Sequence, residues 1–236
     1  MHKVRLGYLL AGGSCLAALA GALNAAFLLL LGTSVSHLSG DVARFAIDIG
    51  AQNGLSGPAF LLLGALVGFV FGALVSGFLI HHPTLELSRP YGRSVTAIGV
   101  TLIGSWACFG RYDFAAVGLA GMACGFQNAL ATHYRGIVLR TTHVTGLLTD
   151  LGVTIGMRLR GYEVQGWKIL VPFVLVLAFC VGAGAGGFAT AQIERGAVLG
   201  VGILYVAGGL LWTLLKRRVF HIPEPATSER LSAPPG

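Results

Sequence analysis

Six long apolar segments constrain the fold of this chain more than any other feature of its sequence. A transmembrane helix needs roughly 17–25 residues to cross a hydrocarbon core of about 30 Å, and every segment meets that length. Hydrophobic residues make up 55% of the 236 residues and charged residues only 11%, whereas ordinary soluble domains carry about 25% charged residues. We therefore predict an all-α integral membrane protein. Its six transmembrane helices are expected at residues 6–31, 57–80, 94–110, 114–134, 167–189 and 196–215.

Basic residues set the expected orientation in the membrane. With six spans, all of the 16 lysines and arginines except Arg44, Arg111 and Arg195 fall on the side of the two termini. Cytoplasmic loops of membrane proteins carry the excess of Lys and Arg, so we predict that both termini are cytoplasmic. The same rule accounts for the net charge of +7, and without a basic stripe with interleaved aromatic residues we predict no nucleic-acid partner. Residues 1–220 would form one membrane domain, and residues 221–236 a disordered cytoplasmic tail.

A polar signature occurs twice in the chain. The pattern Gly-x-x-Asn-Ala surrounds Asn24 and again Asn128, and the His-x-Ser/Thr-Gly pattern of His37 returns at His143. The simplest explanation is an internal duplication. Two repeats of three spans each must lie upside down relative to one another, as in many secondary transporters; if a further short helix in each repeat crossed the membrane, the repeats would be parallel. The two repeats are expected at about 6–110 and about 114–215.

Each repeat also contains a short amphipathic helix, expected near residues 35–49 and 140–155. The first would be about 22 Å long, less than the hydrocarbon core. Such a helix either lies in the membrane interface or enters the bundle as a re-entrant segment whose polar stripe faces a wet interior. We favour the re-entrant alternative because the first stripe carries both signs of charge and no lysine. The two stripes contain His37, Asp41, Arg44 and Asp48, and Arg140, His143, Asp150 and Thr154.

The candidate site consists of the polar residues of the two repeats. Ionisable groups within a membrane are costly and usually mark a pathway or a buried pair, and histidine titrates near neutral pH. We therefore predict a substrate-binding site or proton relay between the repeats. The structural alternatives are helix capping by the histidines, interhelical hydrogen bonds from the asparagines and intrahelical salt bridges of Arg44. No catalytic residue, metal site or cofactor is predicted. The candidate residues are Asn24, His37, Ser39, Asp41, Arg44, Asp48, Gln127, Asn128, Arg140, Thr142, His143, Thr145 and Asp150.

Glycines at small-xxx-small spacing line several spans, as Gly64, Gly68 and Gly72 do in the second. Close backbone contact at such faces supplies packing energy in lipid. The faces either hold the six spans together, which is the commoner role, or pair two copies of the chain as a homo-oligomer.

These features favour a small secondary transporter or permease-like protein, whose partners are the lipid bilayer and an unknown small solute. A non-catalytic structural or partner-binding membrane protein is the first alternative. A membrane-embedded enzyme with a His/Asp pair has less support, because no nucleophile elbow, P-loop or HExxH motif occurs. Both repeats also keep the His-x-Ser/Thr-Gly pattern, whereas catalysis would need only one copy.

The block Gly-Phe-Gln-Asn-Ala at 125–129, followed by Arg-Thr-Thr-His-Val-Thr-Gly at 140–146, is long and specific. Together with the looser Ser36–Gly40 turn, it resembles the YoaK family of bacterial inner-membrane proteins, over residues 7–215. The resemblance implies six spans and a bacterial cytoplasmic membrane, but no substrate or reaction, because the family is a domain of unknown function. Many members have an aspartate where Asn24 stands, so no role that needs a carboxylate at that position carries over.

Overall fold

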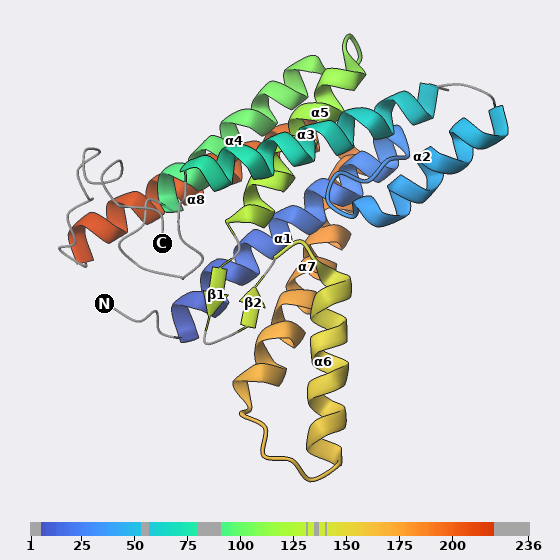
Figure 1. Cartoon of the computed structure of the whole chain (residues 1–236). Coiled ribbons are helices and arrows are strands. Elements are labelled where there is room, and N and C mark those ends of the chain that lie inside the picture. Colours follow the sequence, from blue (N-terminus) through green and yellow to red (C-terminus); the bar gives the residue numbers. More distant parts are fainter. Residues whose placement is uncertain are drawn as a thin grey trace.

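The computed structural model describes residues 6–52, 57–79, 91–130, 132–134, 137–139 and 141–219. These residues form eight helices and one short pair of strands (Figure 1). The helices are α1 (Leu6–Leu31), α2 (Leu38–Gln52), α3 (Gly57–Leu79), α4 (Tyr91–Cys108), α5 (Asp113–Ala129), α6 (Val144–Leu159), α7 (Trp167–Ile193) and α8 (Gly196–Val219); the strands are β1 (Thr132–Tyr134) and β2 (Ile137–Leu139).

Four helices are long and apolar enough to cross a membrane: α1, α3, α7 and α8. They coincide with four of the six predicted spans, so a helical membrane protein is the fold class that the structure supports. The other two predicted spans correspond to α4 and α5, which have 18 and 17 residues and lie at the lower limit of spanning length.

The predicted span at 114–134 is wrong at its C-terminal end, because α5 stops at Ala129. Two short antiparallel strands follow, with Thr132 opposite Leu139 and Tyr134 opposite Ile137. These strands are composed largely of β-branched and aromatic residues, which favour the extended conformation. The hydrophobicity of the segment therefore extended the predicted helix past its actual end. The predicted tail at 221–236 and the predicted site residue Arg140 lie outside the described residues.

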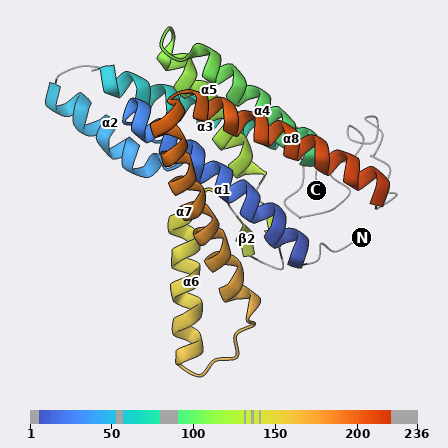
Figure 2. The same ribbon diagram turned by 180° about the vertical axis from the view of Figure 1, so that it is seen from behind.

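The main helix pairs join elements that are distant in the sequence. The most extensive contacts are those of α3 with α5, α1 with α7, and α4 with α8. Among the described elements, α6 makes extensive contacts with α7 alone. In Figures 1 and 2 the α6–α7 hairpin projects away from the layer that contains α3, α4 and α8. The larger buried cluster lies between α1, α4, α5 and α8 and includes Leu23, Phe27, Leu102, Val117 and Tyr205.

Glycine contacts give the direction of the α3–α5 pair. A Cβ atom on Gly72 would overlap the carbonyl group of Met122, and one on Gly125 would overlap that of Phe69. Gly64, near the start of α3, would meet Phe114 at the start of α5 at 3.1 Å. Residue numbers thus rise together along the contact, and the two helices run parallel.

The α1–α7 pair has the same arrangement. A Cβ atom on Gly21 would overlap the carbonyl group of Phe179. One on Gly182 would overlap the carbonyl group of Ala18, and one on Gly186 would overlap Ala22, four residues farther along both helices. α1 and α7 therefore also run parallel. The contact of Gly21 with Phe179 matches that of Gly125 on the other pair, because in each case a glycine of the Gly-x-x-Asn-Ala pattern meets a phenylalanine carbonyl.

α4 and α8 run antiparallel. A Cβ atom on Gly99 would lie 2.6 Å from the carbonyl oxygen of Gly202, and one on Gly92 would lie 2.6 Å from that of Gly209. The same distance separates a Cβ atom on Gly209 from the carbonyl oxygen of Gly92. If α4 and α8 exchange places, the contact of Gly99 with the Gly202 carbonyl becomes the contact of Gly209 with the Gly92 carbonyl. This exchange pairs Gly92 with Gly202 and Gly99 with Gly209.

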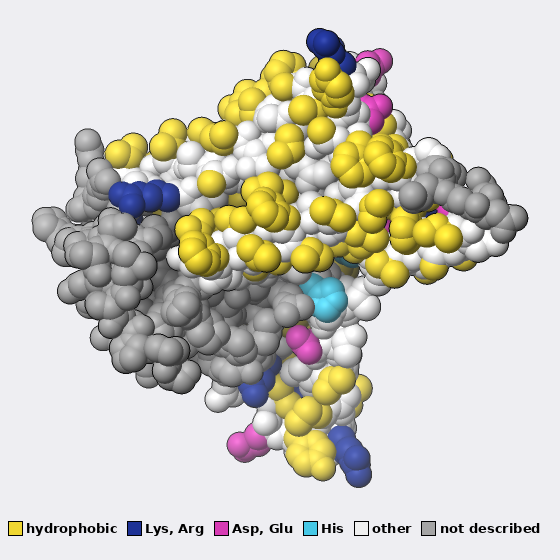
Figure 3. Space-filling model, turned by 45° about the horizontal axis from the view of Figure 1, so that its top comes forward, with side chains coloured by type: hydrophobic (Ala, Val, Ile, Leu, Met, Phe, Trp, Pro, Cys, Tyr) yellow, Lys and Arg dark blue, Asp and Glu magenta, His cyan; other side chains and the backbone are white. Residues whose placement is uncertain are grey.

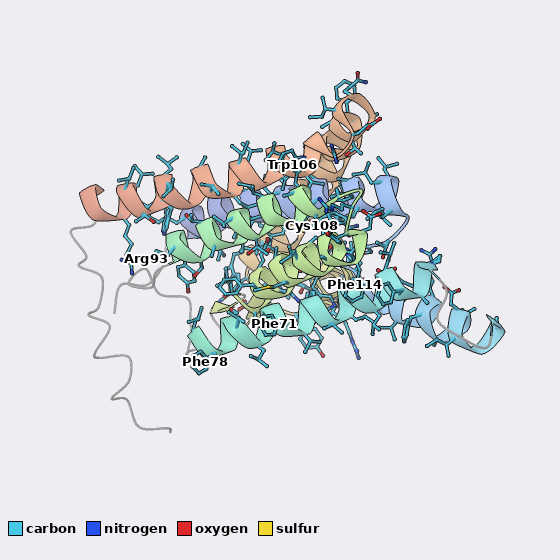
Figure 4. The ribbon with its side chains drawn as sticks, turned by 90° about the horizontal axis from the view of Figure 1, so that it is seen from above. Phe71, Phe78, Arg93, Trp106, Cys108 and Phe114 are labelled. Atoms are coloured by element: carbon cyan, nitrogen blue, oxygen red, sulfur yellow. The ribbon has the colours of Figure 1, made fainter. Side chains whose placement is uncertain are left out.

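The outer surface of the helices is strongly apolar. Figure 3 shows hydrophobic side chains spread over the upper part of the molecule, with visible charged side chains at its margins. Figure 4 shows Phe78 of α3 near the same end as Arg93 of α4, and Phe114 toward the other end. Phe78 is 83% exposed and Phe71 52% exposed. A surface of this kind fits contact with lipid rather than water, because large exposed apolar patches are rare on soluble monomers.

Candidate functional site

Two polar corners follow the two Asn-containing helices. The first corner comprises Asn24 and residues 33–41; the second comprises Gln127, Asn128 and residues 141–147. In the first, α1 ends where Gly32 adopts a positive φ of 65°, and the chain turns back toward its own helix. The Asn24 Oδ1 atom then accepts hydrogen bonds from Ser34 Oγ at 2.9 Å and Ser36 Oγ at 3.0 Å, with the Val35 N–H at 3.4 Å. One amide side chain therefore holds the whole turn before α2.

His37 is positioned by the same turn. Its backbone N–H donates to Ser34 Oγ at 2.9 Å, and its Nδ1 atom lies 2.9 Å from Ser36 Oγ. Its ring packs edge-on against Phe179 of α7, with 5.2 Å between ring centroids. Burial lowers the pKa of His37, and the charge of His143 in the second corner lowers it further. The two histidines of the repeated signature are therefore close enough to interact electrostatically.

Asp41 lies in the first turn of α2 and is only 4% exposed. Its Oδ2 atom is buried and has no hydrogen-bond partner among the described residues. Burial raises the pKa of Asp41, while the charge of Arg44 and the Ser34 backbone hydrogen bond oppose the increase. Arg44 is exposed, and its Nη1 atom donates to the Gly32 carbonyl at 3.0 Å.

The outward face of α2 is apolar. Val42 is 48% exposed, Ile47 65% and Ile49 40%, whereas Asp41 is buried and Asp48 half-buried. This distribution is the reverse of an amphipathic helix on a water-soluble protein. Of the predicted polar stripe, His37, Asp41 and Asp48 are buried or half-buried, whereas Arg44 is exposed.

The second corner repeats one hydrogen bond of the first. Thr142 Oγ1 donates to Asn128 Oδ1 at 2.8 Å, as Ser36 Oγ does to Asn24. The hydroxyl residue stands immediately before the signature histidine in both cases. The predicted role of the two asparagines was interhelical hydrogen bonding, whereas each asparagine accepts hydrogen bonds from the turn that follows its own helix.

Gln127 joins three parts of the second corner. Its Nε2 atom donates to the carbonyl oxygen of Leu16 in α1 at 3.1 Å and to Thr141 Oγ1 at 3.0 Å. Its Oε1 atom accepts a short hydrogen bond of 2.5 Å from the Tyr205 hydroxyl of α8. Gln127 is 4% exposed and Tyr205 1% exposed, so this network links α1, α5 and α8 in the interior.

His143 differs in setting from His37. It stands at the N-cap position of α6 but makes no side-chain capping hydrogen bond. The side chain is exposed and folds over Gly146, where an added Cβ atom would lie 2.5 Å from His143 Nδ1. The glycine of the His-x-Thr-Gly pattern therefore leaves room for the ring.

The remaining predicted residues lie farther from the buried networks. Ser39, Thr145 and Asp150 are exposed. In α6 the inward positions are held by the buried Leu147 and the half-buried Leu151 and Thr154, so of the described residues of its predicted polar stripe only Thr154 turns inward. The two corners thus bring together Asn24, His37 and Asp41 on one side and Gln127, Asn128 and Thr142 on the other.

Sequence reasoning missed Ser34, Ser36 and Tyr205. Ser36 aligns with the predicted Thr142, so its hydroxyl group could have been found from the repeat. A tyrosine within an apolar helix usually has a hydrogen-bond partner when buried, and this was the available signal for Tyr205. No feature of the sequence indicated Ser34, because its contacts depend on the three-dimensional turn. Across the described part of the chain, no group of three or more His, Cys, Asp or Glu side chains is placed to hold a metal ion.

Comparison with known proteins gives a family but no relative of known activity. The family model described as "Protein of unknown function (DUF1275)" matches residues 12–212. No curated protein and no solved structure matches the chain.

Proposed function

Because the chain belongs to the DUF1275 family of unknown function, we propose its function from the corners themselves: a small secondary transporter that moves a small solute between two inverted repeats. The observation that carries this proposal is that both corners meet α1: Asn24 of α1 accepts the hydrogen bond of Ser36 in the first corner, and Gln127 of the second corner donates to the Leu16 carbonyl of α1. In transporters built from inverted repeats, the substrate site lies at the interface of the repeats near the bilayer midplane.

The directions of the helices support inverted repeats. If α2 and α6 do not cross the membrane, the remaining helices alternate in direction, so that α3 and α5 run the same way, as do α1 and α7, while α4 and α8 oppose each other. The glycine contacts agree with all three relations. If α2 and α6 did cross, equivalent helices of the two repeats would run in the same direction, and an antiparallel α4–α8 pair would contradict that arrangement. We therefore assign six spans, with α4 and α5 as the two short ones.

The depth of the two corners supports a site between the repeats. The second corner contacts α1 at Leu16 and the first contacts it at Asn24. These residues are eight positions apart, about 12 Å along a helix, and lie on either side of the middle of Leu6–Leu31. α2 then acts as a re-entrant segment that turns its apolar side to lipid and Asp41 to the interior.

The start of α1 and the end of α8 lie toward the same end of the molecule (Figures 1 and 2). An even number of crossings requires this arrangement. The excess of basic residues toward this end supports a cytoplasmic orientation, by the positive-inside rule. The proposed location is the cytoplasmic membrane of a bacterium.

Proteoliposomes containing the purified chain test the proposal. A flux screen of small solutes across a range of pH should find at least one solute that enters faster than into protein-free vesicles. His37→Ala and His143→Ala should each slow that flux, with Cys15→Ala on the exposed side of α1 as a matched surface control. Absence of flux for every solute class would contradict transport, and unchanged flux in both histidine variants would remove them from the pathway.

The satisfied network of Gln127 and Tyr205 favours one alternative, a non-catalytic protein whose polar residues pack the bundle. That alternative predicts that both histidine variants lose thermal stability and that no solute crosses the membrane. The flux screen therefore separates the two.

A further inference from the structure

The two corners share a scaffold but differ at one buried position. The repeat aligns Gly40 with Gly146, so the next residue, Asp41, aligns with Leu147. Both side chains are buried, at 4% and 3% exposure. The first corner therefore holds a carboxyl group where the second holds an aliphatic side chain.

The surroundings of Asp41 leave its carboxyl group only partly hydrogen-bonded. The hydroxyl groups of Ser34 and Ser36 both donate to Asn24 Oδ1, so their protons are directed away from Asp41. The Ser34 backbone provides a hydrogen bond to the carboxylate, but Oδ2 has no partner among the described residues. An ionised carboxylate in a buried site is strongly disfavoured unless it is paired and hydrogen-bonded.

Few charges face this carboxylate. Its own corner and helix contribute His37, Arg44 and Asp48, and the neighbouring α1 and α3 carry no charged side chain. Arg44 acts on Asp41 but is exposed, and one of its guanidinium nitrogens bonds the Gly32 carbonyl. Solvent weakens the stabilisation that an exposed arginine can give. His143, from the second corner, acts on His37.

We propose that Asp41 is a proton-binding carboxyl group that takes up one proton per chain from water during the working cycle. The step converts the carboxylate to the neutral acid and needs no other reactant, and the unpartnered Oδ2 atom gains an O–H group. Since Leu147 occupies the equivalent position, the second corner contributes no matching proton site. The proton site itself does not depend on the proposed transport function. Only the role of Asp41 in coupling proton movement to solute movement rests on that function.

Infrared titration of the full-length protein in lipid nanodiscs tests the proposal. The wild type should show the carbonyl stretch of a protonated carboxylic acid that persists to higher pH than for an exposed aspartate. Asp41→Asn should lack this band, whereas the matched control Asp113→Asn, at the start of α5, should retain it. Absence of the band from the wild type, or its survival in Asp41→Asn, would overturn the assignment.

Titration with sodium replaced by choline identifies the ion. The midpoint should be the same in both salts if a proton alone neutralises Asp41; a midpoint that moves to lower pH in sodium would show a bound metal cation and overturn the proposal. Neither measurement requires a transported solute. A failed flux screen would therefore disprove transport while leaving the proton site intact, and a missing band would disprove the site while leaving transport open.

Discussion

The first and second corners use the same hydrogen bond for different purposes. In both, a hydroxyl residue just before the signature histidine donates to the asparagine of the preceding helix. Around this bond the first corner has Asp41 with an unpartnered oxygen, whereas the second has Gln127 with its amide bonded to three groups. The comparison shows that the two corners share one hydrogen bond that holds the turn, and that the first surrounds it with a buried carboxyl group and the second with a hydrogen-bonded amide.

The alignment of the two halves shows a second difference, in the core around the corners. Gln127 aligns with Leu23, and the glycine matching of α4 with α8 aligns Tyr205 with Val95. The polar pair of the second repeat therefore stands where the first repeat has an apolar pair. A hydrogen bond between two buried side chains needs both partners, since a lone buried donor or acceptor costs about 1–3 kcal/mol.

The largest difference between the corners is expected from their asparagines. Asn24→Leu should destabilise the protein more than Asn128→Leu, because Asn24 accepts three hydrogen bonds within its turn and each buried donor left unpaired costs roughly 1–3 kcal/mol. Thermal unfolding in detergent measures the difference. Equal losses in the two variants would show that the turns are equivalent in energy despite their different bonds.

Substitution of the contact glycines should lower thermal stability by similar amounts in the two halves of the chain. Gly125→Ala and Gly21→Ala each place a Cβ atom into a phenylalanine carbonyl, and overpacking of this kind costs about 1–3 kcal/mol. Gly77→Ala is the control, because its Cβ atom would meet nothing within 4 Å and alanine is favoured over glycine in a helix by up to about 1 kcal/mol. Thermal midpoints should fall for the first two variants and not for the third; a fall for only one of the pair would refute the equivalence of the α1–α7 and α3–α5 contacts.

The Tyr205–Gln127 bond should contribute a smaller amount. Tyr205→Phe removes the hydroxyl donor to Gln127 Oε1 and should cost about 1 kcal/mol, the lower end of the range for leaving one buried acceptor unpaired. Val95→Ile, at the equivalent position of the first repeat, changes no polar contact and serves as the control for side-chain volume. Denaturation of the two variants under the same conditions would sharpen the comparison, and a neutral Tyr205→Phe would mean that the polar network of the second corner is not a support.

The smallest effect concerns Arg44, whose equivalent in the second repeat is Asp150. Arg44→Gln should cost under about 1 kcal/mol, because exposed charged contacts are weak, although the side chain bonds the Gly32 carbonyl. The same variant should raise the pKa of Asp41 further, since Arg44 opposes its increase. In the infrared titration the carboxylic acid band would then persist to higher pH, and a band that moved to lower pH would contradict the assigned charge interaction.

The pH dependence of stability follows from Asp41. Its folded-state pKa is raised, so the stability that it contributes is present at low pH and is lost as the pH rises through the folded-state value. The thermal unfolding midpoint of the wild type should fall as the pH rises from the ordinary aspartate pKa to the raised folded-state pKa of Asp41. The midpoint of Asp41→Asn should not fall over this pH interval.

The membrane character of the chain and its short helices could be predicted from the sequence, since both depend on local composition and periodicity. α2 and α6 begin within a few residues of their expected positions. The end of α5 was not predictable from hydrophobicity, because Thr132 and Tyr134 suit a strand as well as an apolar run. The interior contacts of Ser34 and Tyr205 depend on a turn and on a helix distant in the sequence, and no local pattern specifies them. Sequence periodicity also predicted polar stripes on both short helices without showing that His143 and Asp150 of the second stripe are exposed.

The pairing of α1 with α7 has a consequence for how the protein is made. α1 is synthesised well before α7, the helix that its Gly21 surface contacts, because α2 to α6 lie between them in the sequence. α1 must therefore enter the bilayer with its contact surface uncovered, and neither half of the chain can complete its own assembly. During biogenesis the contact surfaces of the first half must therefore stay uncovered, in lipid or on an insertion factor, until the helices of the second half are inserted.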